Sequence, residues 1–315
     1  MSDSQTSEVT EFVRVPGNPA PDGARITWFE GIAGRRLRAC IAPATASPAR
    51  GTAIVCPGRT EFIEKYFETG RDLQARGFAV VILDWPGQGL SERLLEDPAK
   101  GHIDRFETFM GALSNGLEAF GADLPRPFVS LAHSMGGAIA LAAITQKLVK
   151  VEAAAFSAPM WGLPINLAAR YLIWAMRAMG RSGDYVRQPG PAETFETNIV
   201  THDKARWELQ RALIDAAPEL ELGPFTWGWV GASLDILDKT TKPAALRGVE
   251  IPVFVASAEE EQLVDNKAHA RVAKHLPDCT HITVDGARHE ILMEIDARRA
   301  IFWGGFDGLL DRAGI

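Results

Sequence analysis

The segment 131–137 combines the end of an apolar run, a serine between small residues and two glycines. Its sequence, Leu-Ala-His-Ser-Met-Gly-Gly, is a variant of the G-x-S-x-G motif in which Ala132 replaces the first glycine. A serine on a sharp strand-to-helix turn needs small neighbours, and a glycine after it lets the helix pack closely. The motif therefore predicts Ser134 as the nucleophile of an acyl-transfer reaction, although an ordinary strand-to-helix turn can have the same pattern.

A serine hydroxyl attacks a carbonyl only when a base accepts its proton, and a histidine oriented by a carboxylate supplies such a base. His289 lies just after an apolar, β-branched run, in a loop at the carboxyl end of the expected sheet. We therefore expect His289 to be the base. His133 is too close to Ser134 in sequence to bend back toward it. The remaining histidines are expected in structural or surface positions: His102, His202, His269, His275 and His281.

The carboxylate is expected in the loop that follows the apolar run 251–256. That loop contains four acids: Glu259, Glu260, Glu261 and Asp265. Three consecutive glutamates also suit a solvated turn, and Asp265 or Asn266 could cap the next helix. The residues alone therefore leave the choice of acid open. The chain order serine, acid, histidine is that of α/β-hydrolases and differs from the orders in chymotrypsin and subtilisin.

These candidate residues need a scaffold, and the chain alternates short apolar runs with longer segments of helical spacing. This alternation predicts an α/β fold with a mostly parallel sheet flanked by helices. Strands are expected at 26–29, 37–42, 52–56, 78–84, 128–131, 151–156, 251–256 and 281–284. Helices are expected at 64–76, 104–120, 137–148, 266–275 and 292–310. The first two strands could form an antiparallel edge with Gly31 and Gly34 in their turn.

The segment 160–242 interrupts the alternation. It has helical spacing without a clear strand, and it holds five of the eight tryptophans. We therefore predict a helical cap at 160–242, inserted into an α/β core that consists of 25–159 and 243–315. Residues 1–24 are polar and lack a basic flank followed by an apolar run, which predicts a polar N-terminal tail and no signal peptide.

Charge and composition exclude several classes of function. The chain has 33 basic and 40 acidic residues, a net charge of -7, which argues against a nucleic-acid-binding face. No run reaches the roughly 18 apolar residues of a membrane-spanning helix. Cys40, Cys56 and Cys279 fit neither a disulfide framework nor a metal-binding motif. We expect a cytoplasmic protein without metal or cofactor, and the sequence leaves its oligomeric state open.

Six segments give the chain a specific resemblance to the α/β-hydrolase superfamily. It is similar to the group of lysophospholipase L2 and monoacylglycerol lipase, serine hydrolases of the serine aminopeptidase S33 type. The similar segments are VCPGRTE (55–61), DWPGQGLS (84–91), HSMGG (133–137), THD (201–203), VDN (264–266) and GARHEIL (286–292). The resemblance extends from about residue 25 to the C-terminus. The Pro-Gly-Arg loop and the Arg-His-Glu-Ile-Leu run make it stronger for the lysophospholipase L2 branch.

The resemblance implies roles for further residues. The family's acid stands in Asp-x-Val-Val, and laying that pattern on residues 261–264 makes Glu261 the orienting acid, with Glu260 as the alternative. The oxyanion hole would consist of the backbone N–H of Met135 and, by resemblance to the family's His-Gly-x loop, that of Arg59. The proline before Gly58 has no N–H to donate. Glu61 matches a family glutamate that we expect to support this loop.

The expected reaction is a two-step ester hydrolysis in which Ser134 is acylated and a water activated by His289 releases the acid. The apolar residues of the cap would line a slot for a fatty acyl chain, or they would only pack the cap. The segment 167–179 could rest on the inner face of a membrane. The negative net charge favours a neutral or zwitterionic lipid ester. The alternatives are an esterase or aminopeptidase for small soluble substrates, and a non-catalytic binding protein with this fold.

Overall fold

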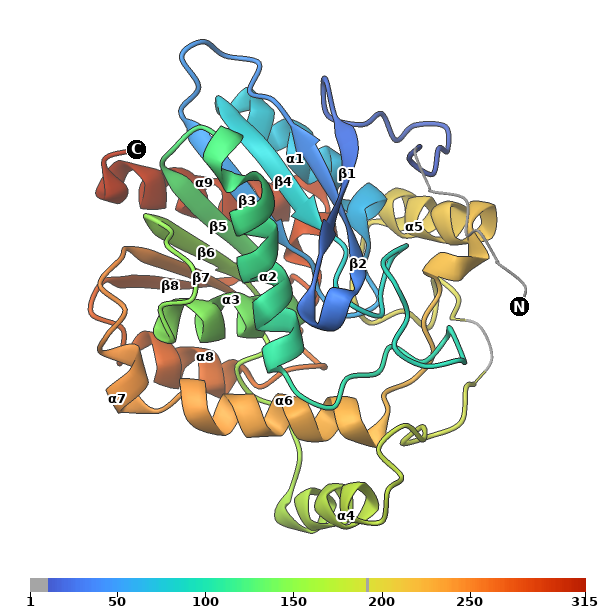
Figure 1. Cartoon of the computed structure of the whole chain (residues 1–315). Coiled ribbons are helices and arrows are strands. Elements are labelled where there is room, and N and C mark those ends of the chain that lie inside the picture. The colour runs from blue at the N-terminus through green and yellow to red at the C-terminus, as the bar shows by residue number, and fades with distance from the viewer. Residues whose placement is uncertain (1–10, 191–192) are drawn as a thin grey trace.

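The computed structural model of the chain describes residues 11–190 and 193–315. Within these residues, eight strands form one twisted sheet in the order β1-β2-β4-β3-β5-β6-β7-β8 (Figure 1). They are β1 (Arg25–Glu30), β2 (Arg36–Ala42), β3 (Gly51–Cys56), β4 (Phe78–Leu83), β5 (Phe128–His133), β6 (Ala153–Ser157), β7 (Val253–Ala258) and β8 (Cys279–Val284). The sheet is parallel except where β2 pairs with β1 and β4. The predicted α/β-hydrolase fold and its antiparallel edge are confirmed.

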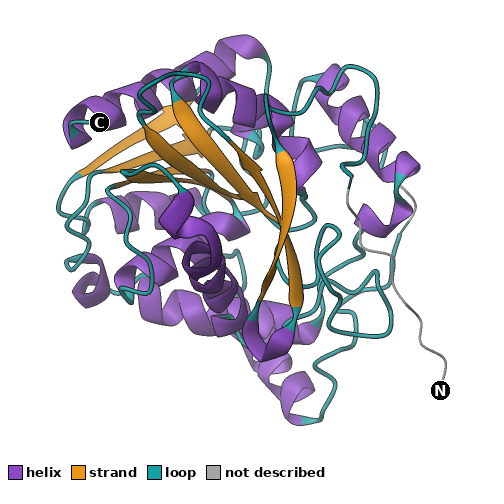
Figure 2. Cartoon of the chain, turned by 45° about the horizontal axis from the view of Figure 1, so that its top comes forward, coloured by secondary structure: helices purple, strands orange, loops and turns teal. Residues whose placement is uncertain are grey.

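Helices cover both faces of the sheet (Figure 2). α1 (Phe67–Ala75) and α9 (Asp296–Ala313) pack on one face, and α2 (Glu107–Phe120), α3 (Met135–Thr145) and α8 (Asn266–Ala273) pack on the other. The central strands are buried on both faces, which explains their continuous apolar sequences. This sandwich holds the carboxyl ends of the parallel strands at one edge.

Some helix ends differ from the expected ones by two to four residues. The expected helix 64–76 begins with a 3-10 turn at Ile63–Tyr66 and continues as α1, and the expected helix 292–310 begins with a turn at Ile291–Met293 before α9. α3 begins at Met135, two residues before the expected start, because its first turn follows Ser134 directly. Helical spacing sets the apolar face of a helix, whereas its ends depend on local turns.

The segment between β6 and β7 is helical, as its spacing indicates. It contains α4 (Leu167–Ala178), α5 (Lys204–Ala216), α6 (Trp227–Thr240) and α7 (Pro243–Leu246). α4 packs on α6, and α6 packs on α3, so these helices extend over the carboxyl edge of the sheet (Figure 1). α5 lies apart from them beside α1, where Arg206 forms an ion pair with Glu68. In the insertion, α4 and α6 therefore cover the sheet edge, whereas α5 is held against the core by an ion pair.

Residues 11–24 lie against the core. The Phe12 ring packs edge-on against Phe67 with 5.1 Å between centroids, and the Asn18 amide donates to the Glu64 carbonyl oxygen at 2.9 Å. The first ten residues of the expected polar tail lie outside the described residues. Among the residues that are described, no helix combines the length and apolarity needed to cross a bilayer.

Candidate active site

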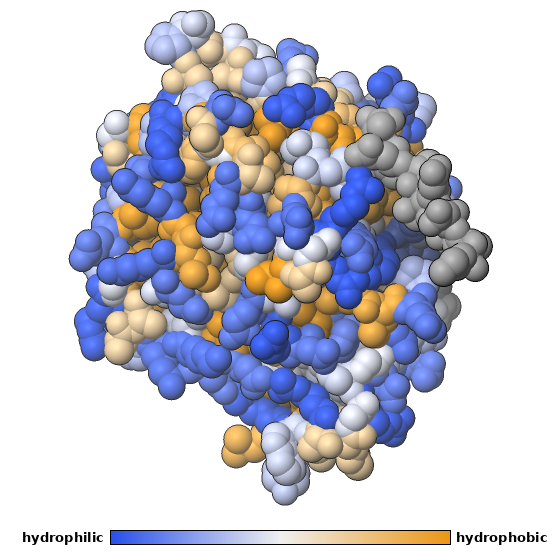
Figure 3. Space-filling view, viewed as in Figure 1, coloured by the Kyte–Doolittle hydropathy of each residue, from blue (hydrophilic) through white to orange (hydrophobic). Residues whose placement is uncertain are grey.

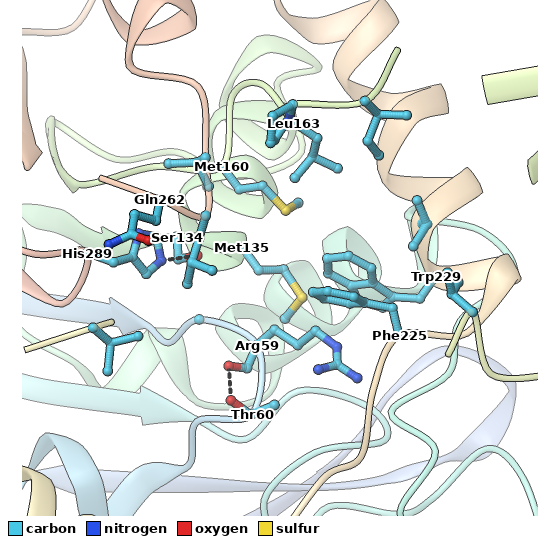
Figure 4. A pocket seen from close by; sticks show the side chains of 18 of the residues that line it. Arg59, Thr60, Ser134, Met135, Met160, Leu163, Phe225, Trp229, Gln262 and His289 are labelled. Carbon is cyan, nitrogen blue, oxygen red and sulfur yellow. Dashed lines mark hydrogen bonds between the residues drawn. The ribbon is translucent and has the colours of Figure 1, made fainter. Parts of the chain in front are cut away.

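Ser134 lies at the sharp turn between β5 and α3, at φ 49° and ψ -118°. This left-handed conformation is strained for a residue with a side chain, and such strain is stored where the surrounding structure fixes the turn. Gly136 supplies the close packing that the motif requires, because a side chain there would overlap the carbonyl oxygen of Cys56 on β3. The turn presents the Ser134 hydroxyl to a cavity (Figure 4).

The structure brings Ser134, His289 and Glu261 into one hydrogen-bonded line. His289 Nε2 lies 2.9 Å from Ser134 Oγ, and His289 Nδ1 lies 2.7 Å from Glu261 Oε2. The other Glu261 oxygen accepts from the backbone N–H groups of Leu263 and Val264 at 2.7 and 3.2 Å. The three side chains come from loops after β5, β7 and β8, which end at the same edge of the sheet. This geometry permits proton transfer from the serine to the imidazole.

Glu260 and Glu261, the two candidates for the acid that orients His289, point in different directions. Glu260 Oε2 lies 3.2 Å from His202 Nε2 and 3.7 Å from Arg288 Nε, and its side chain is 47% exposed. Glu261 is buried against His289. Burial raises the pKa of Glu261, but the hydrogen bond and charge of His289 and two backbone N–H groups outweigh it and hold the pKa below its usual range. An ionised Glu261 keeps the proton on Nδ1 of His289.

Five of the other six histidines form side-chain hydrogen bonds away from Ser134. His133 is buried beside His289, with 4.8 Å between ring centroids, and its Nδ1 bonds the Ser157 carbonyl oxygen at 3.0 Å. Burial lowers the pKa of His133 to about 4, although the nearby Glu61 charge opposes this effect, so the ring is neutral at pH 7. His102 bonds Thr226, His202 bonds Glu294, and His269 and His281 both bond Ser257.

The loop after β3 is held beside Ser134 by polar contacts on several sides. Glu61 accepts hydrogen bonds from the Gly58 N–H and, at 2.6 Å, from the Tyr66 hydroxyl. The Gln88 side chain donates to the Gly58 carbonyl oxygen at 3.0 Å. Trp85 Nε1 donates to the Pro57 carbonyl oxygen at 2.8 Å. Trp85 and Gln88 belong to the DWPGQGLS segment. That segment therefore serves the site by supporting the loop.

A buried ion cluster lies beneath this loop. Lys65 Nζ pairs with Glu61 at 2.8 Å and with Glu290 at 2.6 Å. Burial raises the pKa of Glu61, but the charge of Lys65 and the hydrogen bonds from Lys65 and Tyr66 outweigh this effect and lower the pKa to about 2. Sequence reasoning did not identify Lys65 and Glu290. Their signal is weak, because a Lys four residues after a Glu is common on exposed helices.

Two backbone N–H groups are available beside the serine. Met135 is the first residue of α3, so its N–H has no partner within the helix. The Arg59 N–H has no hydrogen-bond partner among the described residues. Both residues line the same cavity as Ser134 and His289. The arrangement is suited to stabilising negative charge on a carbonyl oxygen bound at Ser134.

The cavity above Ser134 has a volume of about 530 Å³ and a mainly apolar wall. Side chains of the inserted helical segment and its flanks supply most of that wall: Met160, Leu163, Ile165, Leu172, Ile173, Phe225, Trp227, Trp229 and Val230. Of the cap tryptophans, Trp227 and Trp229 line it, Trp161 is buried in the core, and Trp174 is 60% exposed. These tryptophans therefore do not share one role: two form part of the cavity wall, and one packs in the core.

Comparisons with known proteins identify the family of this chain. The hydrolase family described as serine aminopeptidase, S33, matches residues 47–296. Lysophospholipase L2 of Escherichia coli K12 is 34% identical over 262 residues, which cover 79% of this chain and 76% of that protein. A probable lysophospholipase L2 of Haemophilus influenzae is 29% identical over 79% of this chain and 80% of its own length.

A crystal structure of a soluble variant of monoglyceride lipase from Saccharomyces cerevisiae has the same fold. Its TM-score is 0.72 at 17% identity, over 92% of this chain and 96% of that chain. The family match covers more than half of the chain, and the expected family is confirmed. The chain belongs to the serine aminopeptidase S33 family of α/β-hydrolases.

Proposed function

We propose that this chain hydrolyses the carboxylic ester of single-chain lipids, of the lysophospholipid or monoacylglycerol kind, through an acyl-enzyme on Ser134. The observation that carries the proposal is the hydrogen-bonded line from Ser134 through His289 to Glu261, with Ser134 and His289 in the wall of a mainly apolar cavity. The two relatives named lysophospholipase L2 support this class of substrate.

In the first step, Ser134 Oγ attacks the ester carbonyl while His289 Nε2 accepts the serine proton. Glu261 stabilises the imidazolium that forms. The oxygen of the tetrahedral intermediate accepts from the N–H groups of Met135 and Arg59, each worth roughly 3 to 4 kcal/mol of barrier. His289 then protonates the leaving alcohol. Water, deprotonated by His289, then attacks the acyl carbon; the Ser134 oxygen leaves, takes the proton back from His289, and the fatty acid is released.

The apolar wall of the cavity supports the proposal that the site binds the acyl chain of its substrate. Each methylene moved from water into an apolar site contributes about 0.8 kcal/mol, or roughly a fourfold gain in affinity. We therefore expect kcat/KM to rise with chain length in a series of p-nitrophenyl esters that begins with the acetate. Lysophosphatidylcholine and 1-monoacylglycerol measured beside the series test the natural esters. A preference for the acetate contradicts the lipid proposal and favours the small-ester alternative.

We also propose that the outer face of α4 contacts a membrane, which would place the protein at the inner membrane face. Leu167 is 84% exposed, Tyr171 is 71% exposed and Trp174 is 60% exposed. In Figure 3, apolar side chains lie at the surface where α4 protrudes. Leu172 on the same helix is half exposed and also lines the cavity, so this face adjoins a route for the substrate.

The double substitution Leu167→Ser and Trp174→Ser tests the membrane contact, because neither side chain lines the cavity. We expect slower turnover of lysophospholipid presented in anionic vesicles and an unchanged rate with soluble p-nitrophenyl butyrate. Equal vesicle-dependent rates for the double variant and the wild type would contradict the contact. The double substitution Lys204→Gln and Glu208→Gln, of an exposed ion pair on α5, serves as a matched surface control that leaves the net charge unchanged.

A further inference from the structure

Arg59 carries a positive charge in the cavity wall that no carboxylate of residues 11–190 and 193–315 neutralises. Its Nη2 donates to the backbone carbonyl oxygens of Gly223 and Pro224 at 2.8 and 2.9 Å. Its Nε is buried without a hydrogen-bond partner, and no acidic side chain among the described residues forms an ion pair with it. Nη1 of Arg59 also makes no hydrogen bond with the described residues, but unlike Nε it is not fully buried. Nη1 is therefore the donor left for a ligand.

Aromatic rings fix the position of this guanidinium. Arg59 Cζ lies 4.4 Å from the Phe225 ring centroid and 5.4 Å from that of Trp229, and the two rings are stacked on each other (Figure 4). The electrons of an aromatic face attract a cation placed over it. Burial lowers the pKa of Arg59 to about 10, so the side chain remains charged at pH 7. The charge is held in place before any substrate binds.

Other buried cations of this structure are paired differently. Arg38 contacts both Glu64 and Asp84, and Lys65 contacts both Glu61 and Glu290. Withdrawing a cation from water costs several kcal/mol unless an anion compensates it. Backbone carbonyls and rings compensate Arg59 only in part. A cation that is paired with no acid and faces a binding cavity is suited to an anion brought by the ligand.

We propose that Arg59 binds an anionic oxygen of the substrate, specifically the phosphodiester of a lysophospholipid. This inference rests on the proposed function and selects lysophospholipids over monoacylglycerols within it. The same residue offers its backbone N–H to the ester carbonyl, and an extended arginine side chain reaches about 6 to 7 Å from Cα to Cζ. In a lysophospholipid, the glycerol unit separates the ester carbon from the phosphorus by about the same distance.

The released fatty acid offers the same chemistry, because its carboxylate is also an anionic oxygen. The two sources are distinguished by substrate selectivity and product inhibition. A guanidinium that binds the phosphodiester changes the ratio of kcat/KM for two substrates with identical acyl chains. A guanidinium that binds only the carboxylate leaves that ratio unchanged and alters inhibition by the fatty acid.

The test compares palmitoyl-lysophosphatidylcholine with 1-palmitoylglycerol in the same mixed micelles, using the wild type, Arg59→Gln and Arg59→Lys. Removing one charge-assisted hydrogen bond should lower the phosphate-to-neutral ratio about tenfold to a hundredfold in Arg59→Gln. Arg59→Lys keeps the charge and should retain most of the ratio. Arg181→Gln is the matched control, because Arg181 pairs with Asp184 and does not line the cavity.

An equal fall of both rates in Arg59→Gln would indicate a purely structural role and overturn the inference. A changed inhibition constant for palmitate with an unchanged ratio would also overturn it, in favour of the product carboxylate. If Arg59→Gln does not fold, inhibition of the wild-type protein by ether analogues of the two lipids tests the inference instead. The ether analogue of lysophosphatidylcholine should then inhibit at least about tenfold better than the ether analogue of monoacylglycerol, and equal inhibition refutes the inference. Inactivity of the wild type on both lipids instead refutes the proposed function.

Discussion

Replacing Glu261 by Gln tests the assignment of the orienting acid. The change keeps the size of the side chain and removes a charge 2.7 Å from the His289 Nδ1 atom. With about 4 Å between the charge centres and an effective dielectric constant of about 20, the lost attraction to the imidazolium is about 4 kcal/mol. That value corresponds to about a thousandfold in rate. The amide can also donate to Nδ1, which favours the tautomer that cannot accept the serine proton.

We therefore expect kcat to fall about 10³- to 10⁴-fold in Glu261→Gln, a magnitude similar to that of the equivalent change in other serine hydrolase triads. Initial rates of p-nitrophenyl butyrate hydrolysis at pH 8 measure the effect, and circular dichroism checks the fold. KM should change little, because Glu261 does not line the cavity.

Glu260→Gln is the matched control, since this neighbouring side chain is half exposed and faces His202 and Arg288. Its kcat should stay within about threefold of the wild-type value, as for most surface substitutions. The reasoning fails if Glu261→Gln retains more than a tenth of the wild-type kcat, or if Glu260→Gln loses as much activity as Glu261→Gln.

Two further predictions concern buried residues around the serine. The pKa of His133 is about 4 when folded and 6.5 when unfolded, so the unfolded chain binds the extra proton, and stability falls by up to about 3 kcal/mol as pH drops from 6.5 to 4. Urea unfolding across that range should give a shallower decline for His133→Asn, and an unchanged slope would contradict the burial argument. Gly136→Ala should destabilise the turn and abolish esterase activity, because its Cβ would overlap the Cys56 carbonyl oxygen. A melting temperature and kcat equal to the wild type would contradict this packing.

Local patterns predicted much of the fold and part of the site. The strands were predictable because parallel strands buried on both faces require continuous apolar runs. Ser134 was a predictable candidate because its strained turn requires small residues two positions before and after the serine, here Ala132 and Gly136. His289 followed from its place after the last strand. In each case, the physical requirement is met by residues that are close together in sequence.

Other features depend on contacts between distant segments. Glu260 and Glu261 are adjacent in sequence, and only the turn bonded to Leu263 and Val264 directs Glu261 toward His289. Helical spacing predicted that the segment 160–242 is helical, but it did not predict the position of α5 beside α1, where Arg206 forms an ion pair with Glu68. The sequence places Arg59 in the loop after β3, whereas its ring contacts come from residues more than 160 positions away.

The net charge of the chain also differs from the local charge at the cavity. The net charge of -7 favoured neutral or zwitterionic substrates over strongly anionic ones. The wall of the cavity that Ser134 also lines, however, contains the guanidinium of Arg59, which pairs with no carboxylate of the described residues. Local charge determines which group a buried pocket binds, because a surface charge is screened over about 10 Å at ordinary ionic strength. A phosphodiester within a zwitterionic lipid satisfies both observations.

Trapping the acyl-enzyme tests the central claim most directly. The protein is mixed with excess palmitoyl-lysophosphatidylcholine, quenched in acid within milliseconds, digested and analysed by mass spectrometry. The account predicts one palmitoyl group on the peptide that contains Ser134, and none in Ser134→Ala. Turnover of the lipid by Ser134→Ala at the wild-type rate, or an acyl group on a different residue, would contradict it.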